Sequence, residues 1–173
     1  MIFKKATRND IGAVGALYDT VCEHLETHVN WPGWKKGVYP TRADAEKGVR
    51  EGTLYMLRDG GEIIGAVKLS HEPEAGYAGV CWGTPDEYDK ILMIYALAVR
   101  PDRMRTGVAG RMMEEAEKIA REQGCVAMRL DAVTGNLPAE KLYTRCGFRC
   151  VVTKSLGYEC YGLPRFDLFE KIL

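Results

Sequence analysis

The sequence predicts an α/β (α+β) fold, with a central mixed, mostly antiparallel sheet flanked by about four helices. An apolar run at 91–99 is followed by a helical pattern and by a second apolar run at 126–132, and such a crossover connects parallel strands. A hairpin signal within 53–70 adds antiparallel strands. The chain of 173 residues has the usual size of one domain, so we expect a single domain over residues 1–173.

The first strand and the first helix follow from the spacing of apolar residues. Residues 1–7 alternate weakly and predict an edge or second strand. Asn9 or Asp10 can cap a helix that runs to about residue 28, because apolar side chains then recur at helical spacing. The stretch 29–40 carries two prolines and two glycines, which predicts a structured loop.

A short helix and a hairpin come next. Thr41, with Asp44 three residues later, resembles a capping box and begins a helix that ends near Gly52. Strand-forming residues at 53–58 and 63–70 flank an Asp-Gly-Gly turn, whose glycines supply the positive φ angles of a tight hairpin. We therefore expect two antiparallel strands here.

The middle of the chain has the clearest pattern of strand, helix and strand. A long connection at 71–89, with a short strand or helix inside it, precedes the buried strand predicted over 91–99. A tight loop then leads to a helix that begins at Gly107 and is capped by Gly124. The next strand, 126–132, is expected to pair in parallel with the strand at 91–99.

Three further elements close the chain. A short helix is predicted over 136–146, and strands are predicted over 148–155 and 165–172. The last strand places apolar side chains on one face and charged ones on the other, as expected of a strand with one covered face.

Composition limits the classes of partner. The 24 basic and 24 acidic residues give a net charge of zero, which argues against a nucleic-acid partner. No apolar run approaches the ~18 residues of a membrane span, and the N-terminal residues lack the apolar core of a signal peptide. We therefore expect a cytoplasmic protein that binds neither nucleic acid nor membrane.

The six cysteines are expected to be reduced thiols, because a chain of this length needs no disulfides and nothing marks it for secretion. Cys146 and Cys150 lack partners at zinc-finger spacing. His24 and His28 lie one helical turn apart, without the glutamate of a zincin motif between them. We therefore predict no metal site.

The segment between the first apolar run and its helix is suited to binding an anion. A strand that leads through a short loop onto a helix N-terminus gathers unpaired backbone N–H groups, and small residues at Gly107, Ala109 and Gly110 let an anion approach. The spacing of the glycines matches neither the phosphate loop of nucleotide hydrolases nor the dinucleotide fingerprint G-x-G-x-x-G. The arginines that can add charge beside a phosphate are Arg100, Arg103, Arg105 and Arg111.

Two motifs carry a resemblance to a known family. The first is the Leu-Ala-Val triplet at 97–99, followed by Pro101 and by the hexapeptide MRTGVA at 104–109. In the motif of that family, glutamine or arginine is usual at the position of Met104, and glycine is frequent at the position of Arg105. The second is the string NLPAEKLYTRCGF at 136–148, in which every motif position is filled. The chain therefore resembles the GNAT superfamily of acyl-CoA-dependent N-acetyltransferases.

The resemblance implies acetyl-CoA as cosubstrate, bound where the two parallel strands splay apart. Pantetheine would contact the backbone of the Leu-Ala-Val triplet, the pyrophosphate would lie over the loop and the helix start, and Asn136 would contact the cofactor arm. The residues that it implies in cofactor binding are Leu97, Ala98, Val99, Arg105, Thr106, Gly107, Val108, Ala109, Gly110 and Asn136.

The expected reaction is direct attack of a primary amine on the thioester, which needs no covalent enzyme intermediate. A backbone N–H near Leu97 or Ala98 would stabilise the oxyanion, and Tyr143 would be the general acid for the departing thiolate. Either the amine binds in its neutral form, or a base takes its proton, for which five candidates stay open: His71, Glu72, Glu87, Asp89 and Tyr95.

The acceptor amine belongs to a small molecule or to a protein, and the sequence does not choose between them. The loop with Trp31, Trp34 and Tyr39 is either one wall of the acceptor cleft or a set of core anchors. The alternative to catalysis is a non-catalytic acyl-CoA-binding sensor or scaffold on the same fold. Exposed edge strands near the C-terminus would also allow a homodimer.

Overall fold

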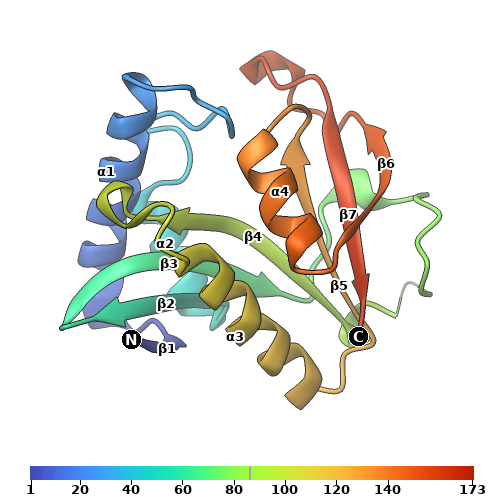
Figure 1. Ribbon diagram of the computed structural model, residues 1–173, viewed down its shortest axis with the longest axis horizontal. Coiled ribbons are helices and arrows are strands. Elements are labelled where there is room, and N and C mark those ends of the chain that lie inside the picture. Colours follow the sequence, from blue (N-terminus) through green and yellow to red (C-terminus); the bar gives the residue numbers. More distant parts are fainter. Residues whose placement is uncertain (86) are drawn as a thin grey trace. The chain divides into compact units, whose positions relative to one another are not determined.

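The computed structural model describes residues 1–85 and 87–173, and within them it contains seven strands and four α-helices (Figure 1). The strands hydrogen-bond in the order β1-β2-β3-β4-β5-β7-β6. The pairs β1–β2, β2–β3, β5–β7 and β6–β7 are antiparallel, whereas β4 and β5 are parallel. The predicted mixed, mostly antiparallel sheet with four helices is therefore confirmed.

Contacts divide the chain into two compact units. The first unit comprises Met1–Asn30, Trp34–Leu69 and Tyr95–Glu115. The second unit comprises Trp31–Gly33, Ser70–Ile94 and Ala116–Leu173. The boundaries fall inside β4 (Ile91–Val99) and α3 (Val108–Glu122), so each of these elements contributes residues to both units.

The first unit contains the N-terminal strands and helices. Its elements are β1 (Ile2–Lys5), α1 (Ile11–Glu26), α2 (Arg42–Glu51), β2 (Leu54–Asp59) and β3 (Glu62–Ser70, of which Ser70 lies in the second unit). The two-residue Gly-Gly turn between β2 and β3 has positive φ at both glycines, 55° and 91°, as a tight hairpin requires.

A side-chain cap explains where α2 begins. The Asp44 carboxylate accepts a hydrogen bond from the Thr41 N–H at 2.7 Å, and the Thr41 hydroxyl accepts one from the Asp44 N–H at 3.4 Å, so the predicted capping box is present. Asp10 precedes α1 as expected, but its carboxylate accepts hydrogen bonds from Thr7 and Arg58 instead of capping that helix. The predicted start of α1 is confirmed, but the Asp10 side chain does not make the capping hydrogen bond that was expected of Asn9 or Asp10.

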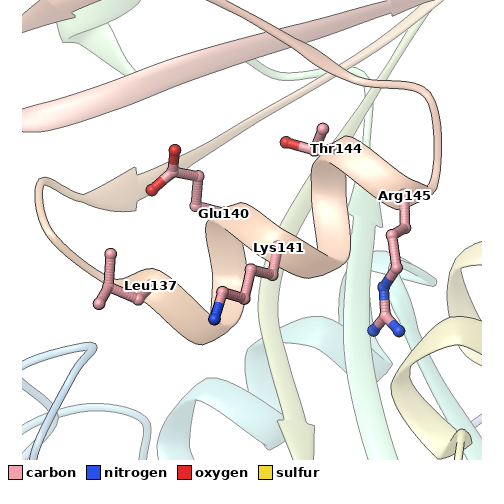
Figure 2. Close-up of a pocket in the computed structure, with 5 residues that line it drawn as sticks. All are labelled: Leu137, Glu140, Lys141, Thr144 and Arg145. Carbon is pink, nitrogen blue, oxygen red and sulfur yellow. The ribbon is translucent and has the colours of Figure 1, made fainter.

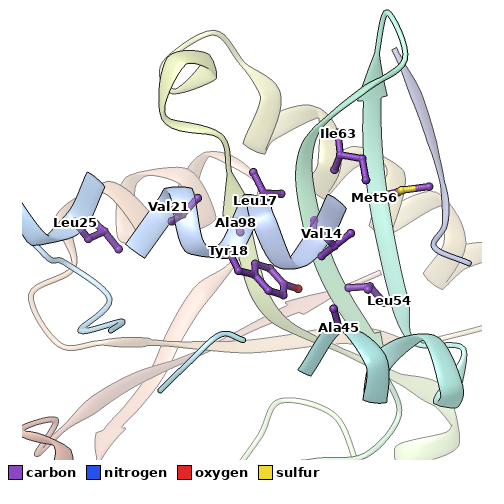
Figure 3. Close-up of a cluster of buried hydrophobic side chains, with 11 residues drawn as sticks. Val14, Leu17, Tyr18, Val21, Leu25, Ala45, Leu54, Met56, Ile63 and Ala98 are labelled. Atoms are coloured by element: carbon purple, nitrogen blue, oxygen red, sulfur yellow. The ribbon is translucent and has the colours of Figure 1, made fainter. Parts of the chain in front are cut away.

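The core of the first unit forms between α1 and the strands (Figure 3). One face of α1 supplies five apolar side chains, and α2, β2, β3 and β4 supply the rest. The buried residues are Val14, Leu17, Tyr18, Val21, Leu25, Ala45, Leu54, Met56, Ile63, Ala66 and Ala98. Because side chains alternate along a strand, burial of Ala98 turns the side chains of Leu97 and Val99 to the other face of β4.

The second unit contains the C-terminal strands and one short helix. Its elements are β5 (Ala127–Val133), α4 (Leu137–Arg145), β6 (Arg149–Lys154) and β7 (Phe166–Ile172). The last strand lies between β5 and β6, so β6 is the edge strand (Figure 1).

The parallel pairing between β4 and β5 is short. It joins Ile91–Ile94 to Ala127–Leu130 and covers only four residues of each strand. Two residues later, Ala96 adopts a left-handed conformation with φ of 49°, which is unusual for a residue that carries a Cβ. The parallel pairing therefore ends several residues before the end of either strand.

Some element boundaries differ from expectation. The first helix ends at Glu26, two residues before the predicted end. The connection at 71–89, of which residue 86 lies outside the described part, contains short 3-10 turns at Ala75–Tyr77 and Tyr88–Lys90. In β7 the charged residue Glu170 is buried, because it pairs with the buried Arg129, whereas the apolar Ile172 is 62% exposed.

No helix within the described residues has the length and apolar character that crossing a membrane requires.

Candidate functional site

The loop before α3, in the first unit, has the backbone geometry of an anion site. The first hydrogen bond of α3 runs from the Arg111 N–H to the Gly107 carbonyl at 3.0 Å, so the three amides before Arg111 lie at the helix N-terminus, where N–H groups have no acceptor within the helix. Arg105 and Gly107 have positive φ angles of 61° and 88°. A Cβ added at Gly107 or Gly110 would meet no atom within 4 Å, so the space beside both residues is open. This geometry suits a phosphate group.

The arginines of this segment differ in whether they form ion pairs. Arg100 pairs with Glu62 and Asp102, Arg103 with Asp59, and Arg111 with Glu115. Over residues 1–85 and 87–173, no ion pair involves Arg105, and its side chain is exposed. Thr106 donates its hydroxyl to the Arg103 carbonyl at 2.7 Å, which fixes the loop beside it.

Close packing holds the start of α3 against the sheet of the first unit. A Cβ at Gly65 of β3 would lie 2.5 Å from the Met112 sulfur and 3.2 Å from the Ala98 carbonyl oxygen. Glycine therefore lets Met112 of α3 pack directly on the strand. Leu97 and Val99 are half-buried, so β4 presents its backbone and these two side chains on the face away from the core.

Asn136, in the second unit, acts as the N-cap of α4. Its side-chain oxygen accepts a hydrogen bond from the Ala139 N–H at 3.2 Å. This local role explains an asparagine at the position. The predicted contact between Asn136 and a cofactor stays a prediction.

Tyr143 lies on the inner face of α4 and is buried. Its ring centroid is 6.2 Å from that of Phe148 and 5.6 Å from that of Phe169 on β7. Burial, and then the nearby charge of Asp131, raises the pKa of Tyr143 well above its ordinary value. The phenol therefore keeps its proton at neutral pH, as a proton donor must.

A cavity of about 620 Å³ runs along the outer face of α4. Figure 2 shows Lys141 and Arg145 on one side of the helix and Glu140 and Thr144 on the other. Leu137 completes the lining near the helix start. The two cations lie one turn apart, so this side of α4 is positively charged.

His71, Glu87 and Tyr95, which belong to the set of proposed bases, each contact another residue. His71 Nδ1 lies 2.8 Å from the Ile91 carbonyl oxygen, and its Nε2 lies 3.2 Å from Gln123 Oε1. Glu87 pairs with Lys90 at 2.5 Å. Tyr95 stacks beneath the Lys68 ammonium, 5.7 Å from its ring centroid. These contacts hold the fold together, and the base stays unassigned within that set.

Sequence reasoning missed a pair of tyrosine–carboxylate contacts in the second unit. Tyr77 donates its hydroxyl to Asp131 Oδ2 at 2.7 Å, and Tyr158 donates to Glu74 Oε2 at 3.1 Å. Burial raises the pKa of Asp131 to about 6, the Tyr77 hydrogen bond opposes that rise, and the charge of Glu74 adds to it. The available signal was an ionisable residue inside the otherwise apolar end of a strand, Leu130 to Val133.

A second missed residue is Arg129, which is fully buried on β5. Its Nε lies 3.0 Å from Glu170 Oε1 on β7, and its Nη2 donates to the Thr84 carbonyl at 2.9 Å. The Trp82 ring covers the guanidinium at 4.3 Å. Arg129 therefore fixes the segment 82–84 against the two strands.

Trp34 connects the aromatic loop to the core of the first unit. Trp34 packs against the core of the first unit, and the Asn30 side chain bonds both its N–H and its carbonyl, at 3.1 and 2.7 Å. Tyr39 meets the Trp34 ring edge-on at 6.1 Å and is 41% exposed. Trp34 thus serves as a core anchor, while Tyr39 presents an aromatic surface.

Within the described chain, no group of three or more His, Cys, Asp or Glu residues could hold a metal ion. In the part of the chain that the structure describes, no disulfide joins any of the six cysteines, which are Cys22, Cys81, Cys125, Cys146, Cys150 and Cys160.

Comparison with known proteins decides the family. The model of the acetyltransferase (GNAT) family matches residues 17–148, which is most of the chain and includes both motifs. The chain belongs to the GNAT family. The matched segment contains the loop before α3, Asn136 and Tyr143 of this GNAT protein.

Related proteins agree with this assignment. The GCN5-related N-acetyltransferase 4, chloroplastic, of Arabidopsis thaliana is 39% identical over 61 residues, 35% of this chain and 21% of that protein. The match therefore spans about a fifth of that relative.

Solved structures share the fold at low identity. An acetyltransferase of the GNAT family from Streptococcus pneumoniae has a TM-score of 0.73 and 17% identity, covering 99% of this chain and 98% of that one. The ribosomal-protein-alanine N-acetyltransferase of Brucella melitensis has a TM-score of 0.72 and 17% identity, with 100% of both chains covered.

Proposed function

We propose that this GNAT protein transfers the acetyl group of acetyl-CoA to a primary amine of a small molecule or protein. The observation that carries the proposal is the open loop before α3, where amides at a helix N-terminus lie near Arg105, which forms no ion pair with any residue that the structure describes. A loop of this kind binds phosphate through backbone N–H groups and one charge-assisted contact. The pyrophosphate of acetyl-CoA supplies such a group.

The proposed contacts with acetyl-CoA divide by chemistry. Backbone groups of Leu97, Ala98 and Val99 bind the pantetheine amides, and Asn136 contacts the same arm. The pyrophosphate takes its hydrogen bonds from the loop and the start of α3, namely Arg105, Thr106, Gly107, Val108, Ala109 and Gly110.

The proposed chemistry needs few side chains. The amine nitrogen attacks the thioester carbonyl carbon, and a backbone N–H near Leu97 or Ala98 stabilises the charge that develops on the oxygen. Tyr143 then donates its phenolic proton to the departing sulfur. Burial raises the pKa of Tyr143 and would also raise that of a thiolate formed beside it, so the sulfur remains able to take the phenolic proton.

The alternative is an acyl-CoA-binding sensor or scaffold without turnover. Met104, which is 36% exposed in the loop, replaces a usual polar contact and favours this alternative. The buried, protonated Tyr143 favours catalysis, because a sensor does not need a proton donor.

Thiol release from acetyl-CoA, followed over a panel of primary amines, tests the proposal. Tyr143→Phe should lower kcat by about 100-fold and leave acetyl-CoA affinity unchanged, because only proton donation is lost. Tyr161→Phe is the matched control, since Tyr161 is 57% exposed, and it should behave as wild type.

Unchanged kcat in Tyr143→Phe would remove that residue from catalysis. Acetyl-CoA binding without thiol release for any amine would instead support the sensor. The single acetyltransferase domain over 1–173, a cytoplasmic location, a homodimer, and the absence of metal, nucleic-acid and membrane partners all stay predictions.

A further inference from the structure

We infer that Asp131 takes the proton from the acceptor amine and that Tyr77 positions its carboxylate for this step. The inference rests on the proposed function and supplies the base that the sequence left open. All of the contacts behind it lie within the second unit.

Asp131 lies on β5 just beyond the part of the strand that pairs with β4. Leu130 is the last β5 residue in the parallel register with β4, so Asp131 is the first residue beyond that pairing. Asp131 is partly exposed as a residue, while burial of its carboxylate raises the pKa of that group.

The faces of β5 separate the proposed base from the proposed acid. Asp131 points to the same face as Arg129, because side chains alternate along the strand. The connection that carries Tyr77 covers that face. Tyr143 packs on Phe169, which lies opposite Leu130 in the register and therefore points to the other face. A proton acceptor and a proton donor thus approach from opposite sides of one strand.

The surroundings of Asp131 suit proton transfer from an ammonium ion. Tyr77 from the 3-10 turn and the Glu74 charge just before that turn face it, and Tyr143 and Tyr158 interact with its charge. With a pKa of about 6, Asp131 is a carboxylate at neutral pH and a stronger base than an ordinary aspartate. The two carboxylates also attract a cationic amine.

The proton balance is complete without another reactant. Asp131 takes one proton from R–NH₃⁺, and the freed lone pair forms the C–N bond as the C–S bond breaks. Tyr143 protonates the sulfur and recovers its proton from the nitrogen, which must lose a second proton to become an amide. Asp131 then releases its proton to solvent.

A purely structural role for Asp131, tying the connection to β5, is the competing explanation. The pH profile of kcat/KM separates the two, using wild type and four variants with an amine that the wild type acetylates. Wild type should lose activity on the acid side with a midpoint near pH 6, because protonated Asp131 cannot accept a proton. Asp131→Asn should lower kcat by about 100-fold or more and remove that acid limb. Its acetyl-CoA affinity, measured by calorimetry, should not change.

Two neighbouring substitutions should move the midpoint in opposite directions. Tyr77→Phe removes a hydrogen bond that stabilises the carboxylate, so the midpoint should rise. Glu74→Gln removes a neighbouring negative charge, so the midpoint should fall. Asp19→Asn on α1 is the control for loss of an aspartate charge and should leave the profile unchanged. General loosening of the structure would not produce opposite shifts.

The carboxyl ¹³C shift of Asp131, followed by NMR in the free protein, reads the same titration without turnover. A midpoint near pH 6 supports the inference, and an ordinary midpoint near 4 overturns it. Wild-type kcat and an intact acid limb in Asp131→Asn would overturn the inference while the proposed function stands. No acetyl transfer by wild type to any amine would overturn both.

Discussion

Two charged residues on β5, Arg129 and Asp131, have different surroundings that suit them to different roles, one structural and one chemical. Arg129 is fully buried, and its guanidinium meets a carboxylate, a carbonyl and an aromatic ring. Asp131, two residues later on the same face, is partly exposed and holds a tyrosine hydroxyl. A charge enclosed by partners stabilises the fold, whereas one that keeps access to a ligand can exchange a proton.

At residue scale, the two glycines of the loop before α3 should respond differently to alanine. Gly107 has φ of 88°, so Gly107→Ala strains the backbone by about 1–2 kcal/mol and should weaken acetyl-CoA binding. Gly110 lies within the helix, where alanine removes the cost of glycine, so Gly110→Ala should raise the free energy of unfolding by about 0.5–1 kcal/mol.

Urea denaturation and acetyl-CoA calorimetry on both variants measure these effects. The pair controls for side-chain size, because each change adds one methyl group to open space. Equal losses of affinity and stability in the two variants would contradict the backbone account of the loop.

At element scale, β4 changes its character along its length. Its first residues, Ile91–Ile94, are buried and pair with β5. The left-handed Ala96 then interrupts the strand, and such a conformation costs an alanine about 1–2 kcal/mol. Backbone strain of this kind concentrates at functional sites, and here it directly precedes the Leu-Ala-Val motif.

Also at element scale, the Arg129–Glu170 pair should hold the connection against β5 and β7. Arg129→Met or Glu170→Leu alone leaves a buried charge without its partner and should cost about 3–5 kcal/mol of stability. The double variant should cost less than the sum, because no lone charge remains.

A double-mutant cycle of urea unfolding measures this coupling energy. The exposed pair Arg42–Glu46 on α2 is the control, with a coupling expected below about 1 kcal/mol. Strictly additive losses at Arg129 and Glu170 would show that the pair does not act as a unit.

At the scale of the whole molecule, local signals predicted the fold well. The capping box at Thr41 and Asp44 and the Gly-Gly hairpin turn each act over a few residues, so the sequence displays them. The parallel crossover at β4, α3 and β5 followed from element order alone. The two motifs likewise placed the chain in its family.

Distant contacts were not predictable in this way. Asp131 meets Tyr77 across 54 residues of sequence, and Arg129 meets Glu170 across 41. Arg129 and Asp131 lie in a strand whose other residues are apolar, and no neighbouring residue in the sequence indicates which side chains they contact. Ala96 was equally hidden, since an alanine in a strand run does not indicate a left-handed residue.

The central claim, an acetyl-CoA-dependent transferase, is tested most directly by calorimetric titration of acetyl-CoA into the wild-type protein. The account predicts saturable, micromolar binding at one site, weakened by Gly107→Ala and unchanged by Tyr143→Phe. Absence of binding to folded wild-type protein would contradict it, because every proposed role of the loop, Asn136 and Tyr143 depends on that ligand.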